Sequence, residues 1–404
     1  MALASSTTSN LRRTAQPIAP VVSVVMPTWN GERFLRPAIE SILNQTFRDF
    51  ELILIDDGST DSTPRILADF KDKDKDNRLI VLTNQRNLGI AGATNRGLAA
   101  ARGEYVALQD HDDISLPHRF QTQVDFLNSH SDVAVLGSAA TLIDDDGVPY
   151  AEFPLPCEEI DIKWRLLFFG DAFHYSSIMV RRSAMQQIGG YGEDTAFRYS
   201  EAYDPFSRIA MGHRMANLPD KLLLWRRHPG ATSIRHTPAQ LRSGEVISLR
   251  NLSLLADQTR NSAHNDLPYL FLGFQAFTST SAGQWPALPA QQVVSGLKFC
   301  SDIQETFYRV HKFSRFDVAR HRQRLNWTWG RHAVALAIRA PWDLRSRISS
   351  FIVGLRCLRR ATSAALVTSL AKVTGSASAR PHLTVPTIKA FKDTPEQPTW
   401  TKSH

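Results

Sequence analysis

Short apolar segments alternate with helical patterns in the N-terminal part of the chain, and this alternation most restricts the possible fold. Segments 22–26, 51–55, 79–82 and 104–108 are apolar runs of strand length. Between them, apolar residues recur every three or four positions, as they do on one face of a helix. Apolar strands that alternate with helices form a largely parallel sheet with helices on both faces. The sequence therefore predicts an α/β fold for this region.

The bulk composition predicts a folded, intracellular type of protein. The 404 residues are 43% hydrophobic and 21% charged, which is typical of a globular chain with room for two or more domains. The three cysteines form no CxxC pair, so neither a zinc site nor a disulfide framework is predicted, and a reducing cytosolic setting fits. The N-terminus lacks the apolar core of a signal peptide, and no apolar run is long enough to predict a transmembrane helix.

Changes of pattern along the chain predict four parts. Residues 1–20 are polar and are expected to be disordered, and residues 21–236 hold the α/β domain. From about residue 237 the alternation stops, and a mainly helical, basic region is predicted for 237–375. Residues 376–404 are predicted to be a flexible tail.

Three carboxylates lie within four residues directly after the strand predicted at 104–108, in Gln109-Asp110-His111-Asp112-Asp113. Carboxylates this close raise one another's pKa unless a cation lies among them. Magnesium and manganese accept oxygen ligands and bridge to phosphates, and open α/β sheets bind ligands at the carboxyl ends of their strands. The cluster therefore predicts a site for a metal-bound nucleotide, and the alternative is a polar turn. A second acidic run, Asp144 to Asp146, precedes Gly147 and is predicted to be a hairpin turn.

The ends of the first two predicted strands carry further candidates. Trp29 follows the first strand, where its ring could stack on a nucleotide base, although a core or rim aromatic is the alternative. Asp57 ends the second strand and can accept a hydrogen bond from a base. Gly58 would let the backbone approach a nucleotide, or it is a plain turn glycine, and Asp56 is expected to hold the turn or cap the next helix.

Four motifs together resemble the family 2 glycosyltransferases, which have the GT-A fold: Val24–Asn30, Ile55–Asp61, Arg102–Tyr105 running into Asp110–Asp113, and Gly189–Tyr191 with Arg226–His228 farther on. The resemblance covers roughly residues 20–236. It implies a Rossmann-like, mostly parallel sheet covered by helices, followed here by a mainly helical extension. It further implies metal-dependent, inverting transfer of a sugar from a nucleoside-diphosphate donor, expected to be UDP-linked, to a hydroxyl acceptor. The expected acceptor is a surface polysaccharide or a lipid-linked glycan.

The resemblance also implies roles for single residues. Asp110 is expected to contact the ribose side of the donor and Asp112 to bind manganese or magnesium, with His228 as a further metal ligand. The other residues implied to bind the nucleotide sugar are Pro27, Trp29, Asn30, Asp57, Gly58 and Arg227. Asp113 is expected to cap the following helix or to orient its neighbours. His174 lines the acceptor cleft in relatives, and a buried, hydrogen-bonded histidine is the alternative.

The catalytic base is the open point of the resemblance. Inverting relatives use a carboxylate that lies six residues before an arginine and removes the proton of the acceptor hydroxyl. Six residues before Arg208 the chain has Ala202, so the expected acid is missing. Glu201 and Asp204 flank this position, and either is a candidate base. The alternative function is a non-catalytic scaffold that binds a nucleotide sugar or glycan, whereas a nucleotidyltransferase would need a glycine-rich phosphate loop that the first strand does not supply.

The positive charge of the chain is concentrated near its C-terminus. Between Arg309 and Lys372, fourteen basic residues stand against two acids, a net +12. The rest of the chain therefore carries about −4, because the total is +8. Residues 345–360 combine an apolar stripe with flanking arginines, which predicts peripheral contact with the inner face of the cell membrane, or packing on the catalytic domain as the alternative. Nucleic acid is not a predicted partner, because no stacking platform or recognition motif accompanies the charge.

Overall fold

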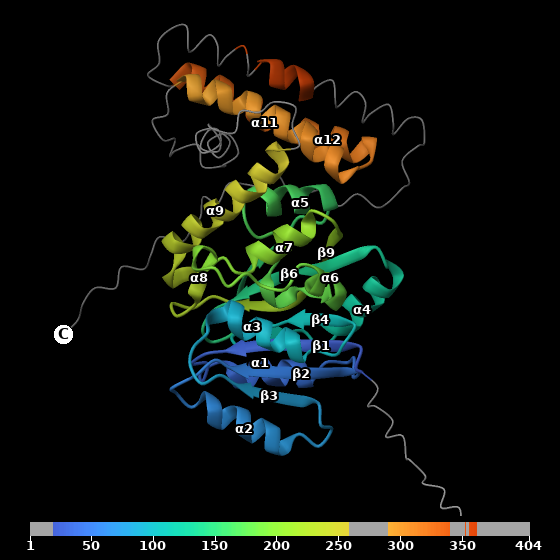
Figure 1. Ribbon diagram of the computed structural model, residues 1–404, viewed down its shortest axis with the longest axis vertical. Coiled ribbons are helices and arrows are strands. Elements are labelled where there is room, and N and C mark those ends of the chain that lie inside the picture. The colour runs from blue at the N-terminus through green and yellow to red at the C-terminus, as the bar shows by residue number, and fades with distance from the viewer. Residues whose placement is uncertain (1–18, 258–289, 340–351, 353–354, 362–404) are drawn as a thin grey trace, which may run out of the picture. The chain divides into compact units, whose positions relative to one another are not determined.

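The computed structural model describes residues 19–257, 290–339, 352 and 355–361 (Figure 1). The chain divides into two compact units that interleave along the sequence. The first unit comprises Met1–Pro154, Phe173–Tyr191 and Asp220–Arg227, and the second comprises Leu155–Ala172, Gly192–Pro219 and His228–His404. The predicted α/β segment 21–236 therefore contributes to both units.

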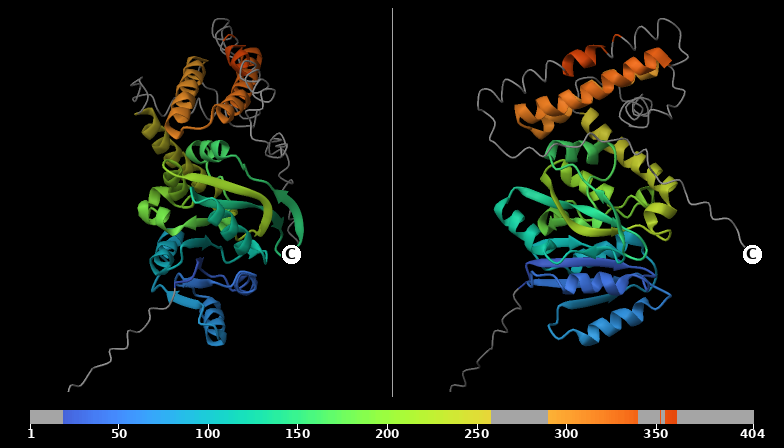
Figure 2. Two further views of the ribbon diagram at one scale, coloured as in Figure 1. Left: turned by 90° about the vertical axis from the view of Figure 1, so that its right-hand side faces the viewer. Right: turned by 180° about the vertical axis from the view of Figure 1, so that it is seen from behind.

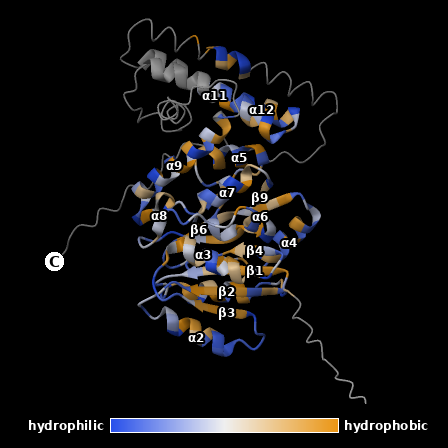
Figure 3. Ribbon diagram, in the orientation of Figure 1, coloured by the Kyte–Doolittle hydropathy of each residue, from blue (hydrophilic) through white to orange (hydrophobic). Residues whose placement is uncertain are grey.

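The sheet begins with four parallel strands, as the sequence predicts. Strand β1 (Val22–Thr28) pairs with β2 (Phe50–Asp56) on one side and with β4 (Tyr105–Leu108) on the other, and β3 (Leu79–Thr83) pairs with β2. Every residue of β1, β2 and β4 is buried, which explains their continuous apolar composition (Figure 3).

Helices cover these strands on both sides, and Figure 2 shows α1 (Leu35–Leu43) and α3 (Gly89–Ala100) on opposite sides of β1. The α3 helix lies so close to β1 and β2 that a Cβ atom on Gly97 would be 2.5 Å from Val25 Cγ1 and 2.9 Å from Ile55 Cδ1. Glycine at this position therefore sets the distance between the helix and the sheet. The remaining helices of this unit are α2 (Thr63–Lys73), α4 (Arg119–Ser129) and α6 (Arg182–Gln187), with the 3-10 helix η1 (Tyr175–Ser177).

Antiparallel strands extend the sheet beyond β4, which the sequence pattern did not predict. Within the described residues the sheet has nine strands, in the order β3-β2-β1-β4-β8-β6-β9-β5, with β7 beside β6. The added strands are β5 (Ile114–Ser115), β6 (Val133–Ile143), β7 (Pro149–Phe153), β8 (Met179–Arg181) and β9 (Arg214–Arg226). The turn between β6 and β7 is the predicted hairpin, because Asp144 Oδ1 accepts hydrogen bonds from the backbone N–H groups of Asp146 and Val148. The α/β class is thus confirmed, with a mixed sheet.

The second unit is mainly helical and has an aromatic core. Trp164 makes edge contacts with Phe168 and Phe307, and Trp329 lies against the same ring. All four rings are buried, so α5, α11 and α12 share one hydrophobic cluster. The elements of this unit are α5 (Glu159–Phe168), η2 (Thr195–Phe197), α7 (Tyr203–Ala210), α8 (Thr232–Arg235), α9 (Thr237–Ala256), α11 (Ala290–His311) and α12 (Arg315–Arg339).

Part of the C-terminal positive charge is paired within this unit. Arg324 on α12 binds the Asp161 carboxylate at 2.6 Å, and Arg320 lies 2.8 Å from Glu158. These arginines therefore tie α12 to the start of α5. No helix among the described residues is long and apolar enough to cross a membrane.

Only part of the predicted amphipathic segment 345–360 is described, since residues 345–351 and 353–354 lie outside the described residues. Residues 355–361 are helical, and this helix buries Cys357 and Ala361. Ile352 and Leu355 remain 43% and 48% exposed. The described part therefore combines a buried face with exposed apolar side chains.

Candidate active site

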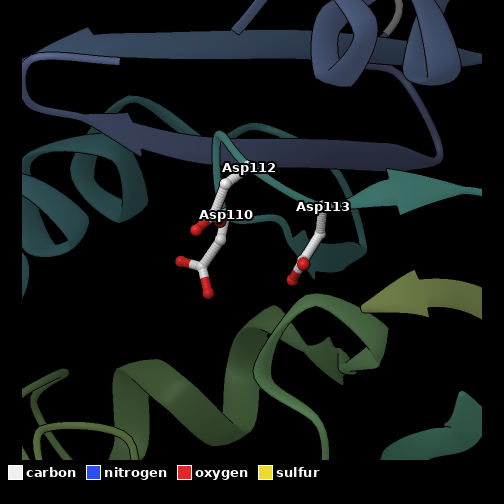
Figure 4. Close-up of side chains that lie close together, drawn as sticks. All are labelled: Asp110, Asp112 and Asp113. Atoms are coloured by element: carbon white, nitrogen blue, oxygen red, sulfur yellow. The ribbon is translucent and has the colours of Figure 1, made fainter. Parts of the chain in front are cut away.

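The acidic cluster lies where the sequence places it, directly after β4 at the carboxyl end of the parallel strands (Figure 4). One carboxylate oxygen from each of Asp110, Asp112 and Asp113 can be chosen so that all three lie within 4.8 Å of one another. Among the described residues, these three acids are the one group of three or more acids, histidines or cysteines that lie close enough together to hold a metal ion. The structure thus brings together the three acids that the sequence singled out.

Gln109 and Arg119 hold the backbone of this acidic loop from inside the protein. The Gln109 side-chain amide donates hydrogen bonds to the carbonyl oxygens of Asp110 (3.1 Å) and Asp113 (3.0 Å). Arg119 donates to Gln109 Oε1 at 2.9 Å and to the Leu108 carbonyl at 3.1 Å. Both side chains are buried, so the loop is braced before any ligand binds.

Asp113 is a buried acid, and both of its carboxylate oxygens accept hydrogen bonds. The Ser176 hydroxyl donates to its Oδ2 atom, and the Arg226 backbone N–H donates to Oδ1 at 2.8 Å. Ser176 also accepts a hydrogen bond from the Asp110 backbone N–H at 3.0 Å. The Arg226 guanidinium donates to the Asp112 carbonyl at 2.9 Å. Ser176 and Arg226 are therefore supports to which the sequence assigned no role, although Arg226 lies in one of the four motifs, because they are more than sixty residues from the loop along the chain.

The electrostatics of the cluster favour a bound cation. Burial, followed by the neighbouring Asp112 charge, raises the pKa of Asp110 to about 8. Burial and then the charges of Asp112 and Asp110 raise the pKa of Asp113 well above its ordinary value. Three oxygen-bearing side chains whose charges oppose one another are a donor set that suits a hard divalent cation. The residues present therefore fit magnesium or manganese.

The loop after β1 carries two exposed candidates, Trp29 and Asn30. Trp29 is 52% exposed although it follows a fully buried strand, so its ring is available for contact with a flat ligand. Asn30 has a positive φ of 49°, and its Oδ1 atom accepts the Thr60 backbone N–H at 2.8 Å. Pro27 is buried within β1, opposite Ile55. Of these candidates, Trp29 is presented to the surface, Asn30 joins the β1 and β2 loops, and Pro27 is part of the sheet.

Asp57 organises the loop that leads into α3. Its carboxylate accepts hydrogen bonds from Asn84 Nδ2 (2.6 Å) and from the backbone N–H groups of Leu88 and Gly89 (both 2.9 Å). Gly58 has φ +71°, and a Cβ atom there would lie 2.9 Å from the Arg86 carbonyl carbon, so this loop requires glycine. The structure thus gives Asp57 and Gly58 clear architectural roles at the carboxyl edge of the sheet.

Two further observations concern the edge of the sheet. Asp56 Oδ1 accepts a hydrogen bond from the Ser59 backbone N–H at 3.0 Å. Asp56 therefore holds the turn, which is one of the two roles expected for it. Thr28 is 1% exposed, and its hydroxyl has no hydrogen-bond partner among the described residues. A buried hydroxyl without a partner at the end of β1 was not flagged by any sequence motif.

Asp204 in the second unit is held by two arginines. Its Oδ2 atom accepts hydrogen bonds from Nε (3.0 Å) and Nη2 (2.7 Å) of Arg208, and its Oδ1 atom accepts one from Arg250. The carboxylate is 2% exposed. Both oxygens of Asp204 are therefore engaged within an ion-pair network that joins α7 to α9.

Glu201 lies in a strained turn before α7. Tyr199 has φ +70°, which is unfavourable for a residue with a side chain, and its ring stacks on His236 at 4.0 Å. Burial raises the pKa of Glu201, while backbone N–H groups act in the opposite direction. Ala202 is the N-cap residue of α7 and supplies no acid. The structure thus leaves Glu201 in an environment that favours proton uptake.

The remaining predicted residues lie near the end of β9. The guanidinium of Arg227 lies over the Trp225 ring at 5.0 Å, and its backbone N–H donates to the Ile143 carbonyl. His228 begins a segment of the second unit, whereas the three acids belong to the first, so its role as a metal ligand stays a prediction. His174 is buried against Phe153 and Trp225, which agrees with the alternative of a packed histidine.

Comparison with known proteins assigns a family to this fold and site. Residues 23–189 match the model of Glycosyl transferase family 2. EpsE of Bacillus subtilis (strain 168), a protein named as a glycosyltransferase, is 37% identical over 204 residues, which cover 50% of this chain and 72% of EpsE. The amylovoran biosynthesis glycosyltransferase AmsE of Erwinia amylovora is 30% identical over 210 residues, covering 50% of this chain and 74% of AmsE. The structure of S. aureus TarS 1–349 in complex with UDP is 16% identical, with a TM-score of 0.45 over 85% of this chain and 91% of TarS.

These matches identify the protein as a transferase with an α/β fold. The chain belongs to the family 2 glycosyltransferases, and its fold is GT-A. The resemblance predicted from the four motifs is confirmed by this family assignment.

Proposed function

We propose that the protein is a metal-dependent, inverting glycosyltransferase that moves a sugar from a nucleoside-diphosphate sugar to a hydroxyl acceptor. The observation that carries the proposal is the braced acidic cluster of Asp110, Asp112 and Asp113 at the carboxyl end of β4. Similarity to AmsE, named for amylovoran biosynthesis, supports a surface polysaccharide or a lipid-linked glycan as the acceptor. We expect a UDP-linked donor.

The first unit would supply the donor site. Asp112 would hold manganese or magnesium, with His228 as the predicted further ligand, and Asp110 would contact the ribose side of the donor. When bound, the ion would neutralise the diphosphate of the donor. Trp29 would stack on the base, since its ring is exposed at the end of β1. Arg227 would balance charge on the leaving diphosphate.

Glu201 is the better of the two candidate bases. Asp204 is already bound by Arg208 and Arg250, whereas burial makes Glu201 more basic. In the proposed step, Glu201 takes the proton of the acceptor hydroxyl while the acceptor oxygen forms a bond to the anomeric carbon. The bond from that carbon to the diphosphate oxygen breaks, and its electron pair leaves with the diphosphate.

Asp112→Ala tests the donor site. We expect the variant to keep its melting temperature, because Asp112 is half-exposed, and to lose manganese-dependent release of nucleoside diphosphate from a panel of UDP-, GDP- and TDP-sugars. Asp146→Ala is the matched control, since it removes an exposed acid from the similarly acidic turn between β6 and β7 and should leave turnover unchanged. Full activity of Asp112→Ala would contradict the metal assignment.

A non-catalytic scaffold is the second candidate, and Ala202 in the expected position of the base favours it. A scaffold would bind the donor without consuming it. Single-turnover measurements with excess protein separate the two functions, because an enzyme converts the bound donor whereas a scaffold returns it intact.

We also propose peripheral membrane contact through residues 345–360. Exposed Ile352 and Leu355 lie near the exposed arginines Arg356 and Arg359, a combination that suits anionic lipid, at about 1 kcal/mol per basic residue near the surface. The double variant Ile352→Ser/Leu355→Ser should sediment less with phosphatidylglycerol vesicles. Leu241→Ser, which changes an exposed leucine of α9, is the control. Equal sedimentation of all three proteins would count against the proposal.

A further inference from the structure

A cavity with charged walls lies within the helical second unit, and none of its lining residues belongs to the four motifs. Its volume is about 360 Å³, and residues of α5, of the turn from α7 into β9 and of the junction between α11 and α12 line it (Figure 1). A space of this size accepts a small molecule. The lining includes the acids Glu159 and Asp317 and the cations Lys163, Arg214 and Lys312, so a ligand there would meet charged groups.

Lys163 is a buried cation with unused hydrogen-bond donors. The residue is 4% exposed, and its Nζ atom lies 3.2 Å from Glu159 Oε1. In the part of the chain that the structure describes, Glu159 is the one hydrogen-bond or ion-pair partner of this ammonium, which carries three N–H donors. Burial lowers the pKa of Lys163, and the Glu159 charge acts in the opposite direction. A buried charge is costly unless its donors are satisfied, so Lys163 suits an anion in the cavity.

The charges that line the cavity do not cancel. Glu159 is shared between two cations, because its Oε2 atom accepts a hydrogen bond from Arg214 Nε at 2.8 Å. The Asp317 carboxylate is already bound by Arg320 at 3.0 Å. Three lining cations therefore stand against the single charge of Glu159, an excess of two positive charges. This excess matches a phosphate monoester, whose charge at neutral pH is about −1.5 to −2.

Lys312 occupies an unfavourable backbone position beside the same cavity. Its φ is +51°, in the left-handed region that glycine adopts more readily. Lys312 follows the end of α11, and its backbone N–H donates to the Tyr308 carbonyl at 3.1 Å. Glycine is the usual residue at such a helix end, whereas this chain has an exposed lysine there. Strain that is kept at a charged residue is typical of a binding site.

We propose that this cavity binds a phosphate group, either as free phosphate or as part of a sugar phosphate. Lys163 would donate from the buried side, while Arg214 and Lys312 would donate from the exposed edge. Ammonium and guanidinium groups are the donors that bind phosphate oxygens most strongly. The inference concerns the second unit alone, and it does not depend on the proposed transferase function.

Calorimetric titration of the full chain with inorganic phosphate tests the site, in EDTA and at constant ionic strength. Lys163→Met keeps the apolar stem and should weaken binding about tenfold or more, because a hydrogen bond to a charged group is lost. Lys312→Gly removes an exposed charge and relieves the positive φ, so it should weaken binding about two- to fivefold and raise the melting temperature.

Two control variants separate this cavity from the rest of the protein. Arg242→Gln removes an exposed positive charge of α9, and Asp112→Ala removes an acid of the proposed donor site. Both should bind phosphate as the wild type does. Glucose 6-phosphate is the second probe: tighter binding than inorganic phosphate would assign the cavity to sugar phosphates, and equal or weaker binding would assign it to free phosphate.

Three results would overturn the proposal. The first is a wild-type protein that binds neither probe, and the second is an equal affinity of wild type, Lys163→Met and Lys312→Gly. The third is binding that is lost in Asp112→Ala but kept in both cavity variants, because phosphate would then bind at the acidic loop. Should Lys163→Met fail to fold, Lys312→Gly decides the test, since it should melt higher and still bind more weakly.

Discussion

Replacing Asp204 by asparagine should cost stability rather than chemistry. The change keeps the size of the side chain but removes the charge that Arg208 and Arg250 share. Removing one partner of a buried ion pair lowers the free energy of unfolding by about 3–5 kcal/mol. Because both arginine side chains are 28% exposed, water compensates part of this loss, and we expect about 2–3 kcal/mol. For a unit of this size, that corresponds to a melting temperature lower by about 4–12 °C.

The assay for this prediction combines thermal unfolding with kcat, measured well below the melting temperature of the variant. We expect a clear drop in melting temperature and a kcat within about tenfold of wild type. Glu201→Gln should show the opposite pattern, with normal melting and lost turnover. An Asp204→Asn protein that melts normally but has lost at least a hundredfold in kcat would refute the structural role and make Asp204 the base.

The remaining predictions concern other parts of the site. Trp29→Ala should weaken donor binding by about 1–3 kcal/mol in calorimetry, without changing the melting temperature, because half of the ring is exposed; unchanged affinity would exclude base stacking. Ser176→Ala should weaken manganese binding about tenfold, since Asp113 loses its hydroxyl donor, whereas the neighbouring Ser177→Ala should not. Asp171→Asn should stabilise the protein at pH 7.5 by roughly 1–3 kcal/mol in denaturant unfolding. Burial raises the folded-state pKa of Asp171, so the wild-type penalty grows as pH rises from about 4 to 6; a gain that persists at pH 4 would contradict this origin.

Local sequence patterns were sufficient to predict the parallel half of the sheet and the acidic loop. The strands β1, β2 and β4 are buried throughout and β3 is partly buried, so their apolar runs are visible without knowledge of their neighbours. The Asp110–Asp113 cluster was equally visible, because its acids are adjacent in sequence and repel one another. The turn at Asp144 was predicted from composition alone, since turn geometry depends on a few consecutive residues.

The features that the sequence did not predict depend on contacts between residues that lie far apart along the chain. Strand β8 is three residues long and pairs with β4 from about seventy residues away, so no periodicity could reveal it. Asp57 was predicted as a base-contacting acid, yet its environment also includes Asn84 and the N-terminus of α3. The choice between Glu201 and Asp204 stayed open in sequence because Asp204 is distinguished by its contact with Arg250, which lies 46 residues farther along the chain.

The sequence by itself determined the α/β class, the family and the acidic cluster after β4, because strand burial, helical periodicity and adjacent charges are properties of neighbouring residues. Only the tertiary structure decided which acids have partners. Asp204 is bound by two arginines and Asp113 by Ser176 and the Arg226 backbone, whereas burial raises the pKa of Glu201. The proton affinity of a carboxylate depends on burial and on charges a few ångströms away in space, and linear order does not specify these.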